Sequence, residues 1–374
     1  MWSTATKLLN CLVKPSTFIA YIQPHPLGSY SIHEIVPTKV SLSDINFFHV
    51  PDYGVINITL IYQDSKGECG DGVSVVRRGS VKEVYEGEHE DELVFLFTDR
   101  ISVFDKPIPS EVPHKGETLC RTAVHWFEQA ERMGISTHFI EQPSPNTMRV
   151  RRVNVISDYS QLNPSTRNYL IPLEFISRYY VAGSLYDRLK SGKVSPEDVG
   201  FSSGHRVEYG EPLPEPFCEV STKLERVDRL LSTQEALRIS GLTPDELEHI
   251  WEMIHRIDEH INRSVARRGL VHVDGKKEFA FDENRELMLV DVFGTADEDR
   301  FWDGAAYDEG RFVEKSKELV RQYYRSIGYV DALYEARRKG EPEPPIPPMP
   351  EELITRASQT YIELFEQITG ERFS

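Results

Sequence analysis

The chain has 374 residues, of which 39% are hydrophobic and 28% are charged. These values are ordinary for a globular protein, and the length is enough to bury a large core in two or three domains or lobes. The 60 acidic residues against 43 basic ones give a net charge of −17, which disfavours nucleic acid as a partner. An anionic substrate therefore has to be held by basic residues that gather at a local site.

The sequence carries no sign of secretion or of a membrane span. Its four cysteines are widely spaced and form no Cys-x-x-Cys pair, so neither a zinc site nor a disulfide framework is indicated. The apolar run near the start is too short for a signal peptide, and no stretch approaches the roughly 20 apolar residues that a spanning helix needs. We therefore predict a cytoplasmic protein with no membrane partner.

The composition of the chain changes near residue 73. Residues 1–72 hold short β-like runs among proline and glycine but no charged constellation, and we predict an N-terminal extension that is either an added domain or an upstream reading frame joined to the gene. Residues 93–98 form a compact apolar strand that ends in the charged run 99–105, and ligands tend to gather at such strand ends. Residues 115–133 have helical spacing and end at Gly134.

Arg178 stands in an otherwise apolar run and is followed by Gly183-Ser184. A buried arginine needs an anionic partner, and a Gly-Ser turn offers backbone N–H groups and a hydroxyl, so the segment is typical of a phosphate or carboxylate cradle. An ion pair with Glu174, four residues earlier on a helix face, explains Arg178 equally well. The pattern leaves both interpretations open.

The next elements are helical. Thr243-Pro244-Asp245-Glu246 is a capping box with proline at the first helical position, and apolar residues then recur at helical spacing up to Gly269. A shorter helix over residues 312–327 carries Lys317 and Arg321 on one face. The proline-rich residues 341–350 predict an extended connector to a last helix over 351–368, which we expect to pack back on the body.

Residues 269–293 have the pattern of one β-hairpin. Asp274, Lys276 and Glu278 alternate with apolar residues, so they share one face of a strand. If residues 282–285 form the loop, Lys276 lies directly opposite Asp291, and Glu278 and Asp291 come within roughly 7 Å of each other at the backbone. Two carboxylates so placed can share one Mg²⁺ ion.

A solvated face of an antiparallel pair shows the same alternation of charged and apolar residues, so the hairpin pattern does not by itself separate a metal clamp from a plain surface. The run that follows favours a site. It places Arg300 between acidic residues and two large aromatic ones rather than in an ordinary surface loop.

A set of motifs in one order carries a family resemblance. From about residue 77 to the end, the chain resembles phosphoribosylaminoimidazole-succinocarboxamide synthase, the SAICAR synthetase of purine biosynthesis. The segments that carry it are Gly79-x-x-Lys82-x-x-Tyr85, Thr98-Asp99-Arg100-Ile101-Ser102-x-Phe104-Asp105, Lys115-Gly116-Glu117, Ile171-Pro172-Leu173-Glu174 with Arg178 and Gly183-Ser184, Ser221-Thr222-Lys223, Asp274-x-Lys276-x-Glu278-Phe279, Asp291, and Asp297-x-x-Arg300-Phe301-Trp302.

The resemblance implies an ATP-dependent ligase that joins the carboxylate of carboxyaminoimidazole ribonucleotide (CAIR) to L-aspartate through an acyl phosphate. It implies an α+β fold with antiparallel sheets in two lobes around an ATP cleft, related to ATP-grasp enzymes, and a possible homo-oligomer. The expected parts are a nucleotide-binding lobe at 73–153, a central substrate and Mg-ATP lobe at 154–335, and the proline connector with the C-terminal helix at 336–374.

Site residues follow from their positions in the family motifs. The resemblance implies catalytic roles for Asp274, Lys276 and Arg300. It implies ATP contacts for Lys82, for the hinge residues Val150, Arg151 and Val153, and for Glu278 and Asp291, the last two also holding Mg²⁺. Substrate contacts are implied for Asp105, Lys115, Arg178, Ser184, Lys223, Asp228, Lys317 and Arg321.

The chain also departs from the family pattern. Ser80 stands where a phosphate-loop lysine is usual, Val292 replaces an acid, Gly275 replaces a bulkier residue, and Ala280 and Ala296 replace a glycine and a proline. Residues 157–170 are an insertion. These departures keep two alternatives in view: a related ATP-dependent ligase with a different acceptor, and a catalytically silent paralogue that acts as a binding protein.

Overall fold

The computed structural model describes residues 21–24, 30–36, 57–62, 75–79, 81–225 and 227–374. The chain divides into two compact units, Met1–Val76 and Arg77–Ser374. In the first unit β1 (Tyr21–Pro24) pairs antiparallel with β2 (Tyr30–Val36), which pairs parallel with β3 (Asn57–Tyr62). The role of the N-terminal extension and the finer division into lobes stay predictions. Ser80 lies outside the described residues.

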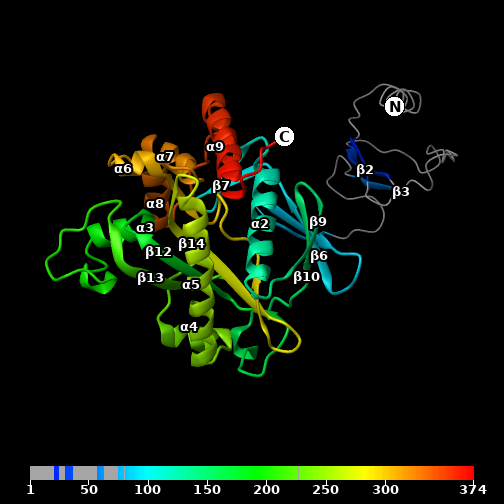
Figure 1. Cartoon of the computed structure of the whole chain (residues 1–374). Coiled ribbons are helices and arrows are strands. Elements are labelled where there is room, and N and C mark those ends of the chain that lie inside the picture. The colour runs from blue at the N-terminus through cyan, green and yellow to red at the C-terminus, as the bar shows by residue number, and fades with distance from the viewer. Residues whose placement is uncertain (1–20, 25–29, 37–56, 63–74, 80, 226) are drawn as a thin grey trace. The chain divides into compact units, whose positions relative to one another are not determined.

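A second sheet contains the predicted nucleotide-binding segment. Its strand order is β4-β5-β6-β10-β9, and its strands are β4 (Val75–Arg78), β5 (Lys82–Glu86), β6 (Glu92–Phe97), β9 (Phe139–Ser144) and β10 (Thr147–Arg151). Helix α2 (Lys115–Arg132) packs against β6, β9 and β10 (Figure 1). As predicted, the helix stops just before Gly134, which has a left-handed φ of 76°. The hairpin β7 (Arg100–Val103) and β8 (Lys106–Glu111) lies between β6 and α2 in the chain.

The third sheet carries most of the predicted site residues. Its path is β11-β14-β12-β13, and both β15 and β16 also pair with β14. The strands are β11 (Tyr169–Leu170), β12 (Leu173–Tyr180), β13 (Pro212–Thr222), β14 (Leu270–Phe281), β15 (Leu287–Val290) and β16 (Arg300–Asp303). All of these pairs are antiparallel, as an α+β fold requires. The long strand β14 is therefore the centre of the sheet.

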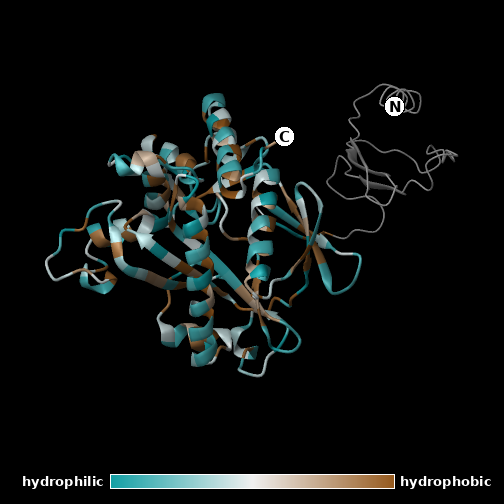
Figure 2. Ribbon diagram, viewed as in Figure 1, coloured by the Kyte–Doolittle hydropathy of each residue, from teal (hydrophilic) through white to brown (hydrophobic). Residues whose placement is uncertain are grey.

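Helix α5 (Pro244–Ala266) begins at the predicted capping box. The Thr243 hydroxyl accepts a hydrogen bond from the Glu246 backbone N–H, and the Glu246 carboxylate accepts one from the Thr243 N–H. The apolar stripe of α5 packs on β14, and Figure 2 shows hydrophilic and hydrophobic residues side by side along the helix. The helix thus delivers the chain directly into β14.

The remaining helices of the described residues lie between and after the strands in the chain. They are η2 (Tyr159–Gln161), α3 (Gly183–Lys190), η3 (Glu197–Val199), α4 (Thr233–Ser240), α6 (Gly304–Asp308), α7 (Glu318–Ser326), α8 (Tyr329–Lys339) and α9 (Glu351–Thr369). The helix predicted over residues 312–327 begins only at Glu318, because residues 312–317 run beside β16 and the Lys315 N–H donates to Phe301 O. Lys317 is the residue before the helix and Arg321 lies within it.

The C-terminal helix packs back on the body, as predicted. Helix α9 lies beside α2 (Figure 1), and Arg121 of α2 pairs with Glu371 at 3.0 Å. The proline connector before it is held by Tyr324, whose hydroxyl donates to Pro347 O at 2.6 Å. Gly370 ends the helix with a left-handed φ of 77°.

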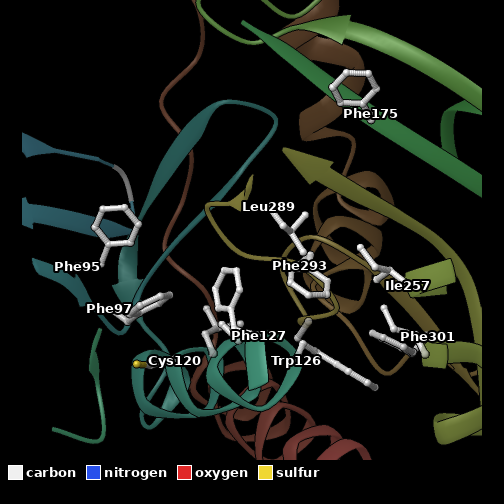
Figure 3. Close-up of a cluster of buried hydrophobic side chains, with 14 of the residues drawn as sticks. Phe95, Phe97, Cys120, Trp126, Phe127, Phe175, Ile257, Leu289, Phe293 and Phe301 are labelled. Carbon is white, nitrogen blue, oxygen red and sulfur yellow. The ribbon is translucent and has the colours of Figure 1, made fainter. Parts of the chain in front are cut away.

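One apolar core joins the two sheets of the second unit (Figure 3). Phe127 of α2 meets Phe293, which follows β15, with ring centroids 5.4 Å apart. Trp126 beside it donates its indole N–H to Gly294 O at 2.9 Å. Leu289 of β15 makes an isolated β-bridge to Thr137, which comes just before β9 of the other sheet. The segment after β15 is therefore fixed against α2 by apolar packing.

Replacing Phe127 with alanine tests this packing. The side chain is fully buried, so Phe127→Ala is expected to lower the free energy of unfolding by about 3–5 kcal/mol. Ile327→Ala, at a side chain that is 47% exposed, is the matched control and is expected to change it by about 0.5 kcal/mol or less. Urea denaturation measures both. Equal losses in the two variants would contradict the assignment of this core.

Candidate active site

The predicted charged face of β14 is present. Lys276 Nζ lies 2.8 Å from Glu278 Oε1, so these two side chains meet on one face. Asp274 on the same face lies 2.6 Å from Arg300 and 3.1 Å from Arg178. Asp274 and Glu278 are buried, and only about a fifth of the Lys276 side chain is exposed. The face is therefore an interior surface and not a solvated one.

The predicted register of the hairpin is wrong by one residue. Glu278 opposes Val290 and Phe281 opposes Leu287, so Lys276 does not lie opposite Asp291. The reason is the turn, which takes one residue more than expected. The Asp282 carboxylate accepts the Glu286 backbone N–H at 2.8 Å, and Arg285 adopts a left-handed φ of 64°.

Asp291 nevertheless reaches the charged face. It lies just past the end of β15 with a left-handed φ of 61°, which turns its side chain away from the direction that the strand would give it. Its carboxylate contacts Lys82 and lies 3.4 Å from Lys223 Nζ. Lys223 also contacts Glu278. Glu278 and Asp291 therefore meet at a shared lysine in spite of the wrong register, and their common role as metal ligands stays a prediction.

Lys276 is surrounded by carboxylates. Its Nζ lies 2.8 Å from Glu174, 2.8 Å from Glu278 and 3.1 Å from Glu298. Burial by itself lowers the pKa of Lys276, but the carboxylates, Glu278 first, outweigh it and raise the pKa well above its usual value. Lys276 therefore remains a cation at neutral pH and is not a base.

The pKa values of Glu278 and Asp291 shift in opposite directions, although burial acts on both carboxyls in the same way. Burial raises the pKa of Glu278, and Lys223 and Lys276 only partly oppose it. Burial also acts to raise the pKa of Asp291, but Lys82 and then Lys223 hold it well below its usual range. Asp291 is thus a fixed anion.

The other end of the charged face of β14 contains two arginines, Arg178 and Arg300. Arg178 on β12, Asp274 on β14 and Arg300 on β16 are register partners across three adjacent strands. Burial acts to raise the pKa of Asp274, but Arg300 and Arg178 lower it below the ordinary value. Asp274 therefore stays ionised between two cations.

The predicted ion pair between Arg178 and Glu174 on a helix face is absent, so this interpretation is wrong. The segment is strand β12, in which residues four apart are separated by about 13 Å. Glu174 pairs with Lys276 instead, and Arg178 Nε lies 2.8 Å from Glu219 on β13. Glu219 also binds Arg188 of α3 at 2.6 Å. The charge of Arg178 is therefore met by carboxylates of neighbouring strands.

Gly183 and Ser184 open helix α3 beside these arginines. The Ser184 hydroxyl lies 3.3 Å from Arg178 Nη2. Gly183 has φ of 52°, and a Cβ there would stand 2.7 Å from Arg300 Nη1, so glycine is required by both backbone and space. The first turn of α3 and two guanidinium groups converge here, as the predicted anion cradle needs.

A second set of predicted substrate residues meets at Asp297. Lys115, which is fully buried, lies 3.0 Å from the Asp297 carboxylate, and Lys317 lies 3.4 Å from it. The Tyr361 hydroxyl of α9 donates to the same carboxylate at 2.6 Å. Burial is the main cause that lowers the pKa of Lys115. Arg321 lies apart from this set, 3.4 Å from Glu318, which also binds Arg300.

The other predicted residues lie at the rim or in the second sheet. Asp105 is largely exposed and lies 3.7 Å from Arg337. Val150 is fully buried in β10, so its side chain cannot touch a ligand, whereas Arg151 is exposed. Val153 packs against a small apolar cluster that includes Ala280. A hinge contact with adenine would have to come from backbone atoms or from Val153.

Sequence reasoning missed several carboxylates that hold the site. Glu219, Glu314 and Glu318 lie in segments without a quoted motif, and each binds or approaches an arginine of the site. Glu298 was visible in the acidic run before Arg300, yet only the structure shows that it binds Lys276. The signal that could have found them is the number of buried basic residues, each of which needs an anionic partner.

Comparison with known proteins decides the family. The sequence model of SAICAR synthetase matches residues 75–335. The chain belongs to the SAICAR synthetase family. It is 53% identical over 301 residues to the phosphoribosylaminoimidazole-succinocarboxamide synthase of Thermoplasma acidophilum, which covers 80% of this chain and 100% of that relative. Its counterpart from Thermoplasma volcanium is 52% identical over the same shares of both chains.

Solved SAICAR synthetases have the same fold. A type-2 SAICAR synthetase in complex with ADP superposes with a TM-score of 0.56 and 25% identity, covering 80% of this chain and 99% of that one. The SAICAR synthase of Saccharomyces cerevisiae complexed with SAICAR gives 0.62 and 24% identity over 82% of this chain and 98% of its own. The α+β fold class is thus confirmed. No helix in the part of the chain that the structure describes is long and apolar enough to cross a membrane.

The pH dependence of stability tests the environment of Asp228. Asp228 stays partly exposed, yet partial burial of its carboxyl, followed by the nearby charge of Glu174, raises its pKa to about 6, so the folded state disfavours the ionised carboxylate. Above pH 6 this destabilises the protein, and the penalty is relieved as the pH falls through 6 toward the unfolded value. Asp228→Asn is therefore expected to raise Tm at pH 8, with a gain that vanishes near pH 4.

The control for this experiment is Asp91→Asn, in the exposed turn before β6. It is expected to leave Tm unchanged at every pH. A gain for Asp228→Asn that is the same at pH 8 and pH 4 would show that removing its charge is not the cause.

Proposed function

We propose that this chain catalyses the ATP-dependent joining of CAIR and L-aspartate to give SAICAR, ADP and phosphate in purine biosynthesis. Its family membership supports this, as do the relatives that bind SAICAR and ADP. The observation that carries the proposal is the single charged face of β14. A cluster of lysines with Glu278 and Asp291 occupies one end, and the arginines with Ser184 occupy the other.

The reaction needs two anion sites at a fixed separation. A carboxylate is a poor electrophile, so its oxygen must first attack the γ-phosphorus of ATP, releasing ADP and forming an acyl phosphate. The aspartate amine then attacks the acyl carbon, phosphate leaves, and the amine loses a proton. Such chemistry depends mainly on positioning and on neutralising the phosphoryl charge. One end of β14 suits the triphosphate, and the other suits the phosphate of CAIR.

At the nucleotide end, phosphate oxygens compete with the carboxylates for Lys82 and Lys223. When these lysines turn to the phosphates, Asp291 loses both of its lysine partners and Glu278 keeps only Lys276. Two hard oxygen donors then face a nucleotide, which is the setting in which proteins bind Mg²⁺ through one or two carboxylates. A bound Mg²⁺ would neutralise charge on the transferring phosphoryl group.

The carboxylates of Glu278 and Asp291 fit a Mg²⁺ site that protein and nucleotide share, and not a site made by protein side chains alone. Among the described residues, no three His, Cys, Asp or Glu side chains are grouped to hold a metal ion. Phosphate oxygens and water would therefore complete the coordination of Mg²⁺. The two carboxylates are placed to share a cation, because Lys223 already occupies that position between them.

At the substrate end, Arg178, Ser184 and the first turn of α3 hold the phosphate of CAIR. Asp274 remains an anion and so accepts hydrogen bonds from N–H groups of the substrate. Arg300 binds Asp274 and neutralises the negative charge of substrate oxygens. Lys276, always charged, lies between the two ends and holds the carboxylate that is phosphorylated. Lys115 is buried and paired with Asp297, so it acts on the substrate only through the Asp297 carboxylate.

The structure gives no specific support to the alternative functions. Val292, one of the departures from the family pattern, packs against the apolar core, so it does not disturb the carboxylates at the site. A catalytically silent paralogue would not need both charged ends. The roles of Lys317, Arg321, Asp105 and Asp228 toward substrate stay predictions, as do a homo-oligomer, a cytoplasmic location and the relation to ATP-grasp enzymes.

A coupled assay of ADP release tests the proposed function. Sustained release of ADP over many turnovers is expected only when CAIR, L-aspartate and Mg-ATP are all present. Glu278→Gln keeps the shape but removes a buried charge from the nucleotide end, so kcat is expected to fall roughly 100-fold. Glu283→Gln, in the exposed turn of the hairpin, is the matched control and should keep full activity. ADP release that continues without aspartate would refute the proposed reaction.

A further inference from the structure

The back of β14 carries a buried charge network that the reaction itself does not use. Lys277 stands between the site residues Lys276 and Glu278, so its side chain points to the opposite face of the strand. It is fully buried, and its Nζ contacts Asp258 of α5 and lies 3.6 Å from Asp299 Oδ2. A buried ion pair is seldom more stable than apolar residues of the same volume. Stability alone therefore does not explain a lysine at this position.

Asp299 holds the loop 294–299 together and fastens it to β14 through three contacts. Its Oδ2 lies 2.7 Å from His272 Nε2 at the start of β14 and 3.6 Å from Lys277 further along the same strand. Its Oδ1 accepts the backbone N–H of Gly294 at 2.8 Å. The Gly294 contact closes the loop 294–299 on itself, and the other two fasten this loop to β14. The Asp299 side chain is completely buried.

Gly275 has no side chain and so leaves the space that the Asp299 carboxylate occupies. It lies on β14 between Asp274 and Lys276, and a Cβ there would stand 2.2 Å from Asp299 Oδ2 and 2.8 Å from Lys277 Nζ. No side-chain carbon approaches other atoms that closely, so any larger residue would displace Asp299. The replacement of a bulkier residue by Gly275 thus has a structural reason in this chain.

The loop that Asp299 fastens carries site residues on either side of it. Glu298, the preceding residue, binds Lys276 at 3.1 Å, and Arg300, the next one, binds Asp274 at 2.6 Å. We propose that Asp299, seated in the space that Gly275 leaves, is a positioning residue that sets Glu298 and Arg300 against the substrate end of β14. The proposal deepens the proposed function and rests on it.

Two variants of different chemistry test this. Asp299→Ala removes the anchor, and Gly275→Ala leaves every charge in place but pushes the anchor aside. Both are expected to lower kcat/KM for CAIR by roughly 10- to 100-fold, because a shift of about 1 Å in a positioned group has effects of that size. KM for ATP should stay within about twofold, since Asp291 is held separately by Lys82 and Lys223. If Asp299→Ala does not fold, Gly275→Ala alone tests the proposal.

Asp258→Ala is the matched control. It also takes one carboxylate from Lys277, but Asp258 lies on α5 and has no bond to the loop. It is expected to lower Tm at least as much as Asp299→Ala while leaving kcat/KM for CAIR within about twofold of the wild-type value. A fall in kcat/KM for CAIR that is equal in Asp258→Ala, or absent in both test variants, would overturn the proposal.

Hydrogen exchange separates this proposal from the proposed function, because it needs no substrate. In Asp299→Ala the Gly294 amide loses its acceptor, so peptides covering residues 291–300 are expected to exchange at least about tenfold faster, and those in Asp258→Ala are not. Unchanged exchange in Asp299→Ala would overturn the anchor even in an active enzyme. A wild-type chain without CAIR-dependent ADP release would refute the ligase assignment, and exchange would still decide whether the anchor exists.

Discussion

Every charged group on strand β14 must find a partner inside the protein, and the rest of the site follows from that constraint. Asp274, Lys276, Lys277 and Glu278 lie in one short stretch of this strand, and their side chains are largely or fully removed from water. An ion that is buried without a partner costs several kcal/mol. Each of them is therefore met by a residue from another segment, and the strand with its partners forms one connected network.

The pairing assembles a site from distant parts of the chain. Lys82 comes from the second sheet, Lys223 follows β13, and Arg300 begins β16, yet all three bind carboxylates on or beside β14. Because the protein groups neutralise one another, each is held in place before a ligand arrives. Phosphates of ligands can then replace carboxylates as partners of the cations, with little rearrangement of the backbone.

Local patterns predicted the elements well and the partners poorly. The capping box of α5, the end of α2 at Gly134 and the common face of Asp274 and Glu278 depend on residues close in sequence, and the structure confirms them. The register failed because the Asp282 carboxylate enlarges the turn, which alternation cannot show. The anchors Asp299 and Glu219 depend on contacts across the fold, so no local pattern marks them.

We propose that ligand phosphates exchange for carboxylates at the nucleotide end of β14. A crystal structure with Mg²⁺ and a non-hydrolysable ATP analogue tests this exchange most directly, through the partners of Lys82 and Asp291. We expect Lys82 to leave Asp291 for a phosphate and Mg²⁺ to lie between Glu278, Asp291 and the nucleotide. A complex in which Lys82 still binds Asp291, with the metal and phosphates held elsewhere, would contradict it.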